Sequence, residues 1–408
     1  MLRFPKRTTQ VMAVAAVSVL ALSACGRGGG DETPSPGITD DTVTLGVSNP
    51  LSGPVAGPGG CLTDGVIAYF EARNADGGIE FGDGKTRQVE VKALDDTYDP
   101  QKAKSNYDQL HKDSFILGLG LGTPTNRAWR DAAIEDGVPQ VLTSTGDPLF
   151  SDRDESPLQI DAFPTYVSEG AAFGEMLVEN DEEYKVAVLR QNDDYGMDYL
   201  TGLEQSIEAS DKVEIVEELT YEVTDDSIDS QITVLADSGA NVLFNAVSQP
   251  HLTIAALQKA QDLGWDPIWF LPSNTSSAQA ILEPGDASNF EEIYTASYQK
   301  DPANPAYAQD EDVIAFQDAL EEYTDQSPEP EFPHCMWGYM SGAILEEAFA
   351  NTDEPTRESF MDAMFSIEGF HPPLGLDDTV VDTTLDGQPA ISTVTLEIYD
   401  GSGYTAID

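Results

Sequence analysis

The chain has 408 residues and is strongly acidic, with 73 Asp and Glu against 20 Lys and Arg and a formal net charge of −53. This balance argues against nucleic-acid binding, because phosphate contacts need clustered Lys and Arg. The length suits about two to three domains. The acidic residues are spread along the whole chain, which suits a solvated surface in saline surroundings or reflects the composition of a lineage; the sequence leaves both open.

The first residues predict export. Arg3, Lys6 and Arg7 form a positive segment, and the apolar run Val11–Leu22 is too short to span a bilayer comfortably. We therefore interpret residues 1–24 as a secretion signal. Its end, Leu22-Ser23-Ala24-Cys25, resembles the lipobox of bacterial lipoproteins, which implies that Cys25 carries the lipid. An ordinary cleavage site before a cysteine is the alternative.

Residues 25–39 are rich in Gly, Pro, Ser, Asp and Glu and are predicted to form a flexible tether. No later apolar stretch approaches the roughly 20 residues that cross a membrane. The expected location is therefore the extracytoplasmic face of a bacterial cell membrane, with the chain held there by lipid alone.

The first part of the chain alternates strands and helices. Thr42–Ser48 alternates polar and apolar residues like a strand, and Asp64–Asn74 has apolar residues at helical spacing. Asp99 suits an N-cap and Pro100 the first helical position, which predicts a helix to His111. The other elements expected here are strands at Gln88–Leu94, Phe115–Leu119 and Val138–Leu142 and a helix from Pro124.

The same rhythm restarts after Phe163-Pro164. The expected strands are Lys185–Leu189, Val213–Leu219, Asn241–Asn245 and Pro267–Leu271, with helices from Gly196, from Ser227 and over Pro250–Leu263. Two runs of βα units with one break predict an α/β fold of two doubly wound parallel sheets. Helices Glu311–Tyr323 and Met336–Phe349 follow, and strands Val380–Thr384 and Ser392–Tyr399 around Asp386-Gly387 predict a closing hairpin.

Several motifs together resemble the leucine/isoleucine/valine-type periplasmic binding proteins, the type I family that feeds ABC importers. They are, in order, Asn49-Pro50-Leu51-Ser52-Gly53-Pro54, Gly77-Gly78-Ile79, Asp95-Asp96 with Asp99-Pro100 and Ala103, and Asp194-Tyr195-Gly196. The resemblance covers about residues 40–400. It implies two Rossmann-like lobes that close on a ligand like a Venus flytrap, a monomer without cofactor or metal, and ABC permease and ATPase subunits as partners.

The resemblance also implies three hinge crossovers, near Phe163-Pro164, Ala296–Gln299 and Gly369–Pro373. The first lobe is then expected at residues 40–163 and 299–369, and the second at 164–298 and 370–408. With Cys25 acylated, Cys61 and Cys335 remain as a pair in an oxidising compartment, which favours one disulfide. In the family both cysteines would fall in the first lobe; two buried free thiols are the alternative.

The first lobe offers a glycine-rich turn, Gly118 to Gly122, followed by Thr123 and Pro124. Thr123 suits an N-cap, and the free N–H groups of a helix start attract an anion such as a ligand carboxylate. A dinucleotide site is a weaker interpretation, because the full glycine fingerprint is missing. The resemblance adds four further ligand-binding candidates in this lobe beside Gly122 and Thr123: Pro58, where relatives often have an aromatic residue, and Ser144, Thr145 and Gly146.

In the second lobe the resemblance implies ligand contacts from Tyr195, Ser248 and Ser273. Ser273 stands near the acid that pairs with the ligand ammonium in branched-chain amino-acid binders. That acid contributes a charged hydrogen bond of roughly 1.5–3 kcal/mol. Its absence at this position puts the usual mode of leucine binding in doubt, so another acid, or a ligand without an ammonium group, has to be considered.

Two other function classes compete with an importer's binding protein. An α/β enzyme is disfavoured, because the four histidines have no metal-ligand spacing and no Gly-x-Ser-x-Gly motif is present. A tethered sensor that presents ligand to a membrane receptor would use the same cleft. The expected ligand is a small polar molecule, such as an amino acid, an amide or a small carboxylate.

Overall fold

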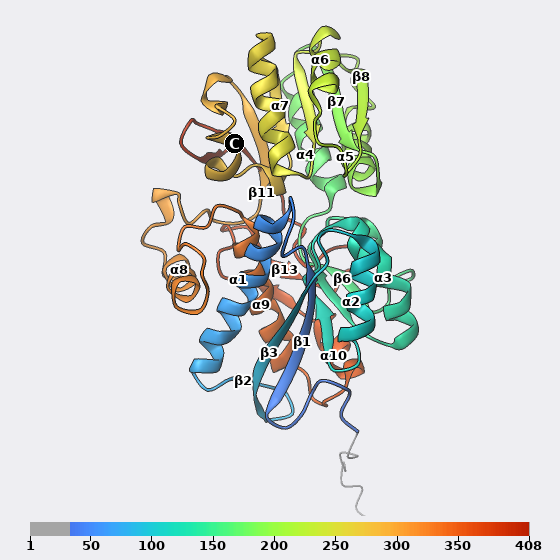
Figure 1. Ribbon diagram of the computed structural model, residues 1–408, viewed down its shortest axis with the longest axis vertical. Helices are drawn as coiled ribbons and strands as arrows, with labels where there is room; N and C mark the ends of the chain where they lie inside the picture. The colour runs from blue at the N-terminus through green and yellow to red at the C-terminus, as the bar shows by residue number, and fades with distance from the viewer. Residues whose placement is uncertain (1–32, 408) are drawn as a thin grey trace, which may run out of the picture. The chain divides into compact units, whose positions relative to one another are not determined.

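The computed structural model describes residues 33–407. Cys25 and the predicted signal, residues 1–24, lie outside this range. Within it, no helix is long and apolar enough to cross a membrane. Two main sheets organise the chain, each with its own helices, and Figure 1 traces their order from the blue N-terminal strands to the red C-terminal segment.

The first sheet has six strands in the order β2-β3-β1-β4-β5-β6. All neighbours are parallel except β2 and β3. The central strand β1 is buried over almost its whole length, as expected for a sheet with helices on both faces. The strands are β1 (Thr42–Asn49), β2 (Ile79–Glu80), β3 (Thr86–Asp95), β4 (Ile116–Gly118), β5 (Gln140–Thr143) and β6 (Gln159–Asp161).

Six helices accompany this sheet: α1 (Ala56–Ala75), α2 (Pro100–Leu110), α3 (Thr123–Asp136), α8 (Glu311–Tyr323), α9 (His334–Ala350) and α10 (Arg357–Met364). Helices α1 and α9 approach closely because glycines face the partner backbone. A Cβ on Gly65 would lie 2.0 Å from the carbonyl oxygen of Cys335, and one on Gly338 would lie 2.1 Å from that of Leu62. Residues far apart in the sequence thus form one tightly packed helix pair.

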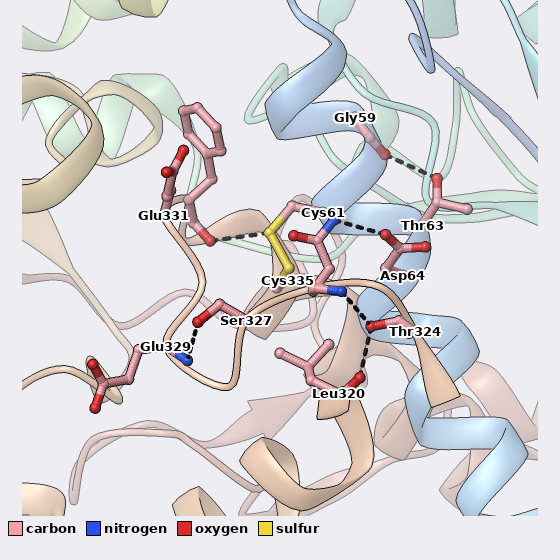
Figure 2. Close-up of a disulfide and its surroundings, with 12 residues drawn as sticks. Gly59, Cys61, Thr63, Asp64, Leu320, Thr324, Ser327, Glu329, Glu331 and Cys335 are labelled. Atoms are coloured by element: carbon pink, nitrogen blue, oxygen red, sulfur yellow. Dashed lines mark hydrogen bonds between the residues drawn. A yellow bond between two sulfur atoms is a disulfide. The ribbon is translucent and has the colours of Figure 1, made fainter. Parts of the chain in front are cut away.

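A disulfide joins these two helices. The sulfur atoms of Cys61 on α1 and Cys335 on α9 are 1.99 Å apart, and the two cysteines are separated by 274 positions in the sequence. Figure 2 shows the bridge between Cys61 on the pale blue helix α1 and Cys335 at the start of α9. Both cysteines are buried, and both belong to the hydrophobic core around the first sheet.

The second sheet has seven strands in the order β15-β14-β11-β10-β9-β7-β8. Its parallel strands are β7 (Tyr184–Gln191), β8 (Val213–Tyr221), β9 (Val242–Ala246), β10 (Ile268–Leu271) and β11 (Ile293–Ser297). Strands β14 (Thr395–Tyr399) and β15 (Tyr404–Ala406) add an antiparallel edge. The helices are α4 (Tyr166–Glu179), α5 (Asp194–Ile207), α6 (Asp229–Asp237) and α7 (Pro250–Leu263).

Short elements fill the connections. They are the helical turns Pro148–Phe150, Ser273–Thr275, Ala278–Leu282, Ala287–Asn289 and Pro305–Tyr307, and the strand pair β12 (Glu368–Phe370) and β13 (Val381–Asp382). The chain passes between the two sheets three times, between β6 and α4, after β11 and before β14. The prediction of two doubly wound α/β units is therefore confirmed.

The C-terminal prediction needs correction. The segments Val380–Thr384 and Ser392–Tyr399 were expected to pair as one hairpin, but β13 pairs with β12 while β14 pairs with β11 and β15. Leu374, Val381 and Ile391 pack in the core of the first sheet. The third crossing therefore follows Ile391 rather than Gly369–Pro373, because these apolar side chains are buried only against the first sheet. The other lobe boundaries stay predictions.

Candidate functional site

One pocket draws on loops that follow strands of both sheets. About 550 Å³ of space lies between its protein atoms, part of it open to solvent. Its walls are Val55, Pro58, Tyr98, Leu121, Gly122, Ser144, Thr145, Gly146, Phe163, Pro164, Tyr166, Glu169, Tyr195, Ser248, Ser273, Asn274, Tyr298, His334 and Trp337. Ligands of doubly wound folds bind at such carboxyl-terminal strand edges.

The structure brings eight of the nine predicted ligand-binding residues together in this pocket. They are Pro58, Gly122, Ser144, Thr145, Gly146, Tyr195, Ser248 and Ser273. Their contact with a ligand stays a prediction. The ninth, Thr123, lies directly behind the wall, with 1% of its surface exposed.

Thr123 was predicted to be the N-cap of α3, and this is wrong. The N-cap is Gly122, with φ of 93°, and Thr123 occupies the first helical position. Glycine is needed because of this φ and because a Cβ there would lie 2.4 Å from the ring of Tyr98. The Thr123 hydroxyl is instead 2.7 Å from that of Thr145, so it ties the start of α3 to the neighbouring loop.

Fewer backbone N–H groups are free to bind an anion at this turn than the sequence suggested. The N–H of Gly122 donates to the carbonyl of Ser144, and the N–H of Ser144 donates to the carbonyl of Gly120, both at 2.9 Å. These two donors are therefore committed to the loop. The Ser144 hydroxyl, by contrast, is buried and has no hydrogen-bond partner in residues 33–407, so it can serve a ligand.

Aromatic side chains make up much of the wall, although Pro58 replaces the aromatic residue that relatives often have. They come from positions that the sequence did not single out as site residues: Tyr98, Phe163, Tyr166, Tyr298 and Trp337. Phe163 and Tyr298 carried a signal only as parts of the predicted first and second crossovers. The pocket is thus apolar around a few polar groups, which is the usual composition of a small-molecule site.

Helix α9 adds two polar atoms that also lack partners. His334 Nδ1 and Trp337 Nε1 are buried and make no hydrogen bond within the described range. Burial lowers the pKa of His334 to about 3, so the imidazole is neutral at physiological pH. With the Ser144 hydroxyl, three pocket residues therefore offer hydrogen-bonding atoms that the folded chain leaves unused.

The pocket residues that belong to the second sheet's half of the chain are held in place by hydrogen bonds within that half. The Tyr195 hydroxyl donates to Asn274 Oδ1 at 3.2 Å, and its ring packs edge-on against Tyr166. The Ser248 hydroxyl donates to Gln191 Oε1, which also accepts from Tyr221. Ser248 is thereby oriented from behind, and Tyr195 is buried at the wall with only 2% of its surface exposed.

A charged contact joins helices α3 and α5 outside the pocket. The Arg127 guanidinium forms ion pairs with Asp147 and, at 2.6 Å, with Asp194. Burial, reinforced by Asp147, raises the pKa of nearby Asp198 to about 7. Arg127 thus pairs with one carboxylate that follows the first sheet's strand β5 and with one on helix α5 of the second sheet.

Residues 42–396 match the family model described as periplasmic binding protein. The chain belongs to this family. A protein of Pseudomonas aeruginosa named for binding leucine, isoleucine, valine, threonine and alanine is 24% identical over 270 residues, 65% of this chain and 70% of its own. A Leu/Ile/Val-binding protein homologue of Brucella melitensis is 29% identical over 50% of this chain and 53% of its own.

Solved structures agree on the fold. A fatty acid ABC transporter substrate-binding protein from Thermomonospora curvata has a TM-score of 0.78 at 22% identity, covering 92% of this chain and 94% of its own. A solute-binding protein from R. palustris in complex with benzoate has a TM-score of 0.71 at 18% identity, covering 90% and 95%. The predicted family and type I fold are thus confirmed, and the family consists of solute-binding proteins rather than enzymes.

Proposed function

We propose that this periplasmic binding protein is the lipid-anchored binding component of an ABC importer and delivers a small polar ligand to a membrane permease. One observation supports the proposal that the protein binds a ligand. Three buried atoms without hydrogen-bond partners in the described residues belong to residues of one pocket: the Ser144 hydroxyl, His334 Nδ1 and Trp337 Nε1. Buried polar atoms without partners are costly, so a ligand that pairs with them is stabilised there.

The compounds named for relatives help to choose the ligand class. Leucine, fatty acids and benzoate differ in size and in the presence of an amino group, but all carry a carboxylate. In this chain the Ser144 hydroxyl and the loop Thr145-Gly146 are the groups suited to it. No Lys or Arg lines the pocket in the described part of the chain, so a carboxylate would be held by neutral donors.

We expect a thermal-shift screen of amino acids, amides, urea and small carboxylates to find a stabilising ligand. A ligand at about 100 times its dissociation constant adds about 2.7 kcal/mol to the free energy of unfolding. Ser144→Ala should weaken that stabilisation, because the pocket loses a hydrogen-bond donor. Ser230→Ala on the exposed surface of α6 is the matched control. Equal shifts in both variants, or no shift with any compound, would contradict the proposal.

Lipid anchoring predicts a second outcome. Cys25→Ala should release the protein from the membrane or mislocalise it, because the rest of the sequence offers no apolar segment long enough to hold it there. Fractionation of cells grown with labelled fatty acid measures both attachment and acylation. Wild-type protein that takes up no label would contradict lipid anchoring, and it would not bear on ligand binding.

A further inference from the structure

Glu169 is the one acidic side chain on the pocket wall within residues 33–407. It lies near the start of α4, whose N-cap is Thr165, and only 2% of its surface is exposed. Three donors converge on its carboxylate: the Tyr199 hydroxyl at 2.8 Å, the Ser273 hydroxyl at 2.8 Å and the Ser273 N–H at 3.2 Å. The side chain is therefore held in one orientation.

This carboxylate has no cationic partner in the described range. It takes part in none of the ion pairs there, and the pocket wall contains no Lys or Arg. His334, also on the wall, is neutral because burial lowers its pKa to about 3. Burying a carboxylate without a counter-ion is expensive, and the usual solution is a pairing cation or a bound proton.

The hydrogen bonds of Glu169 bring it beside Ser273, which stands near the predicted ammonium-pairing position. Ser273 follows β10, where the family resemblance led us to expect the acid that pairs with a ligand ammonium. The structure shows that both donors of Ser273, its hydroxyl and its N–H, point to Glu169. An acid from α4, 104 positions earlier in the sequence, thus contacts the residue that stands near the expected position of that acid.

We propose that Glu169 determines specificity by pairing with an ammonium group of the ligand and loses its proton to solvent when that ligand binds. This inference rests on the proposed function and names its substrate class, a small molecule with both an ammonium and a carboxylate group. The rings of Tyr166, Tyr195 and Tyr298 line the same pocket, and aromatic faces also attract cations.

Proton release follows from the surroundings of the carboxyl group. Burial raises the pKa of Glu169 to about 7, while the hydrogen bonds from Tyr199 and Ser273 oppose the rise. The other titratable groups that face it are tyrosines: Tyr166 on its own helix, Tyr195 and Tyr199 on α5, and Tyr298 after β11. Burial raises the pKa of each of them, so all are neutral near pH 7. Affinity for an ammonium ligand should therefore fall as pH drops below about 7, by at most about tenfold per pH unit.

Matched pairs of compounds test the proposal. The pairs are leucine with 4-methylpentanoate, and phenylalanine with 3-phenylpropanoate; each pair differs only in the ammonium group. Binding to wild type, Glu169→Gln and Glu175→Gln is measured by calorimetry at pH 6 and pH 8. Glu175 lies exposed on the same helix, so its variant carries the same Glu-to-Gln substitution away from the pocket.

Wild type and Glu175→Gln should prefer at least one amino acid over its partner, and Glu169→Gln should lose roughly tenfold to a hundredfold in affinity for it. Calorimetry in two buffers of different ionisation heat should show proton release from wild type at pH 6–7. Glu169→Gln with Ser273→Glu should restore part of the preference. Wild type that binds the ammonium-free compounds as tightly would overturn the role of Glu169 and leave the proposed function intact, whereas no binding to any of them or to benzoate would count against both.

A ligand-free measurement guards against variants that fold poorly. The folded chain holds the Glu169 proton more tightly than the unfolded chain, whose pKa is near the ordinary value for glutamate. This favours the folded state at low pH, and the advantage is lost as pH rises from about 5 through 7. The wild-type melting temperature should therefore fall more steeply over that range than that of Glu169→Gln. Parallel profiles would contradict the protonated, buried state.

Discussion

Removal of the Cys61–Cys335 disulfide should lower the free energy of unfolding by about 2–5 kcal/mol. The bridge closes a loop between positions 274 apart, so it restricts the unfolded chain strongly. Both cysteines are at most 1% exposed. Urea unfolding of wild type with and without reductant, and of the variant Cys61→Ala/Cys335→Ala, measures the effect.

The double-alanine variant is also the control for the reductant, which should leave its unfolding curve unchanged. Peptide mapping under non-reducing conditions should recover the two cysteine peptides linked. Two free thiols in the wild type would refute the disulfide, and so would a wild-type unfolding curve that reductant does not change.

The disulfide also bears on the pocket. Pro58 stands three positions before Cys61 on α1, and Trp337 stands two positions after Cys335 on α9; both line the pocket. The disulfide therefore joins the N-terminal ends of α1 and α9, from which Pro58 and Trp337 contribute to the pocket wall. Once a ligand is known, we expect the double-alanine variant to bind it more weakly than wild type, beyond the loss explained by unfolding.

Tyr195→Ala should be the most damaging substitution at the pocket, at about 3–5 kcal/mol of folding stability, by analogy with other buried aromatic truncations. The Tyr195 ring packs against those of Tyr166 and Tyr199, with centroids 4.7 and 5.1 Å away. Removing it leaves a cavity at the wall. Lost binding in this variant would therefore mix instability with lost contact.

Tyr195→Phe separates the two effects. It keeps the ring and removes only the hydrogen bond to Asn274, which is worth about 0.5–1.5 kcal/mol. If Tyr195 serves ligand-induced closure, this variant should bind more weakly and compact less in solution scattering when ligand is added, because a ligand shifts an equilibrium only by its differential affinity.

Tyr107→Phe is the matched control for this test. Tyr107 is also buried, and its hydroxyl donates to Asp136 at 2.8 Å, but it lies outside the pocket. It should lose stability without losing affinity or closure. Normal affinity and normal compaction in Tyr195→Phe, once a ligand is known, would contradict a role for the Tyr195 hydroxyl in joining the two sides.

Elements with strong local signals could be predicted from the sequence. Helices Pro250–Leu263 and Glu311–Tyr323 have the predicted bounds, and Asp99 caps α2 by accepting from the N–H groups of Gln101 and Lys102. Helix periodicity, caps and prolines act within a few residues, so they are readable without the fold. Helix α1 begins eight positions before the predicted Asp64, because its first turns are rich in glycine and carry no apolar pattern.

The sequence by itself predicted the export signal and determined the βα rhythm and the family resemblance. It also predicted most of the polar residues of the pocket. These features follow from local composition and from motifs in a fixed order. The tertiary structure decided what the pocket can do. It set Thr123 behind the wall, supplied the aromatic rings of Tyr98 and Trp337, and joined Glu169 to Ser273 across 104 positions. Contacts of this kind depend on how distant strands and helices pack, and no local pattern encodes which buried carboxylate meets which hydroxyl.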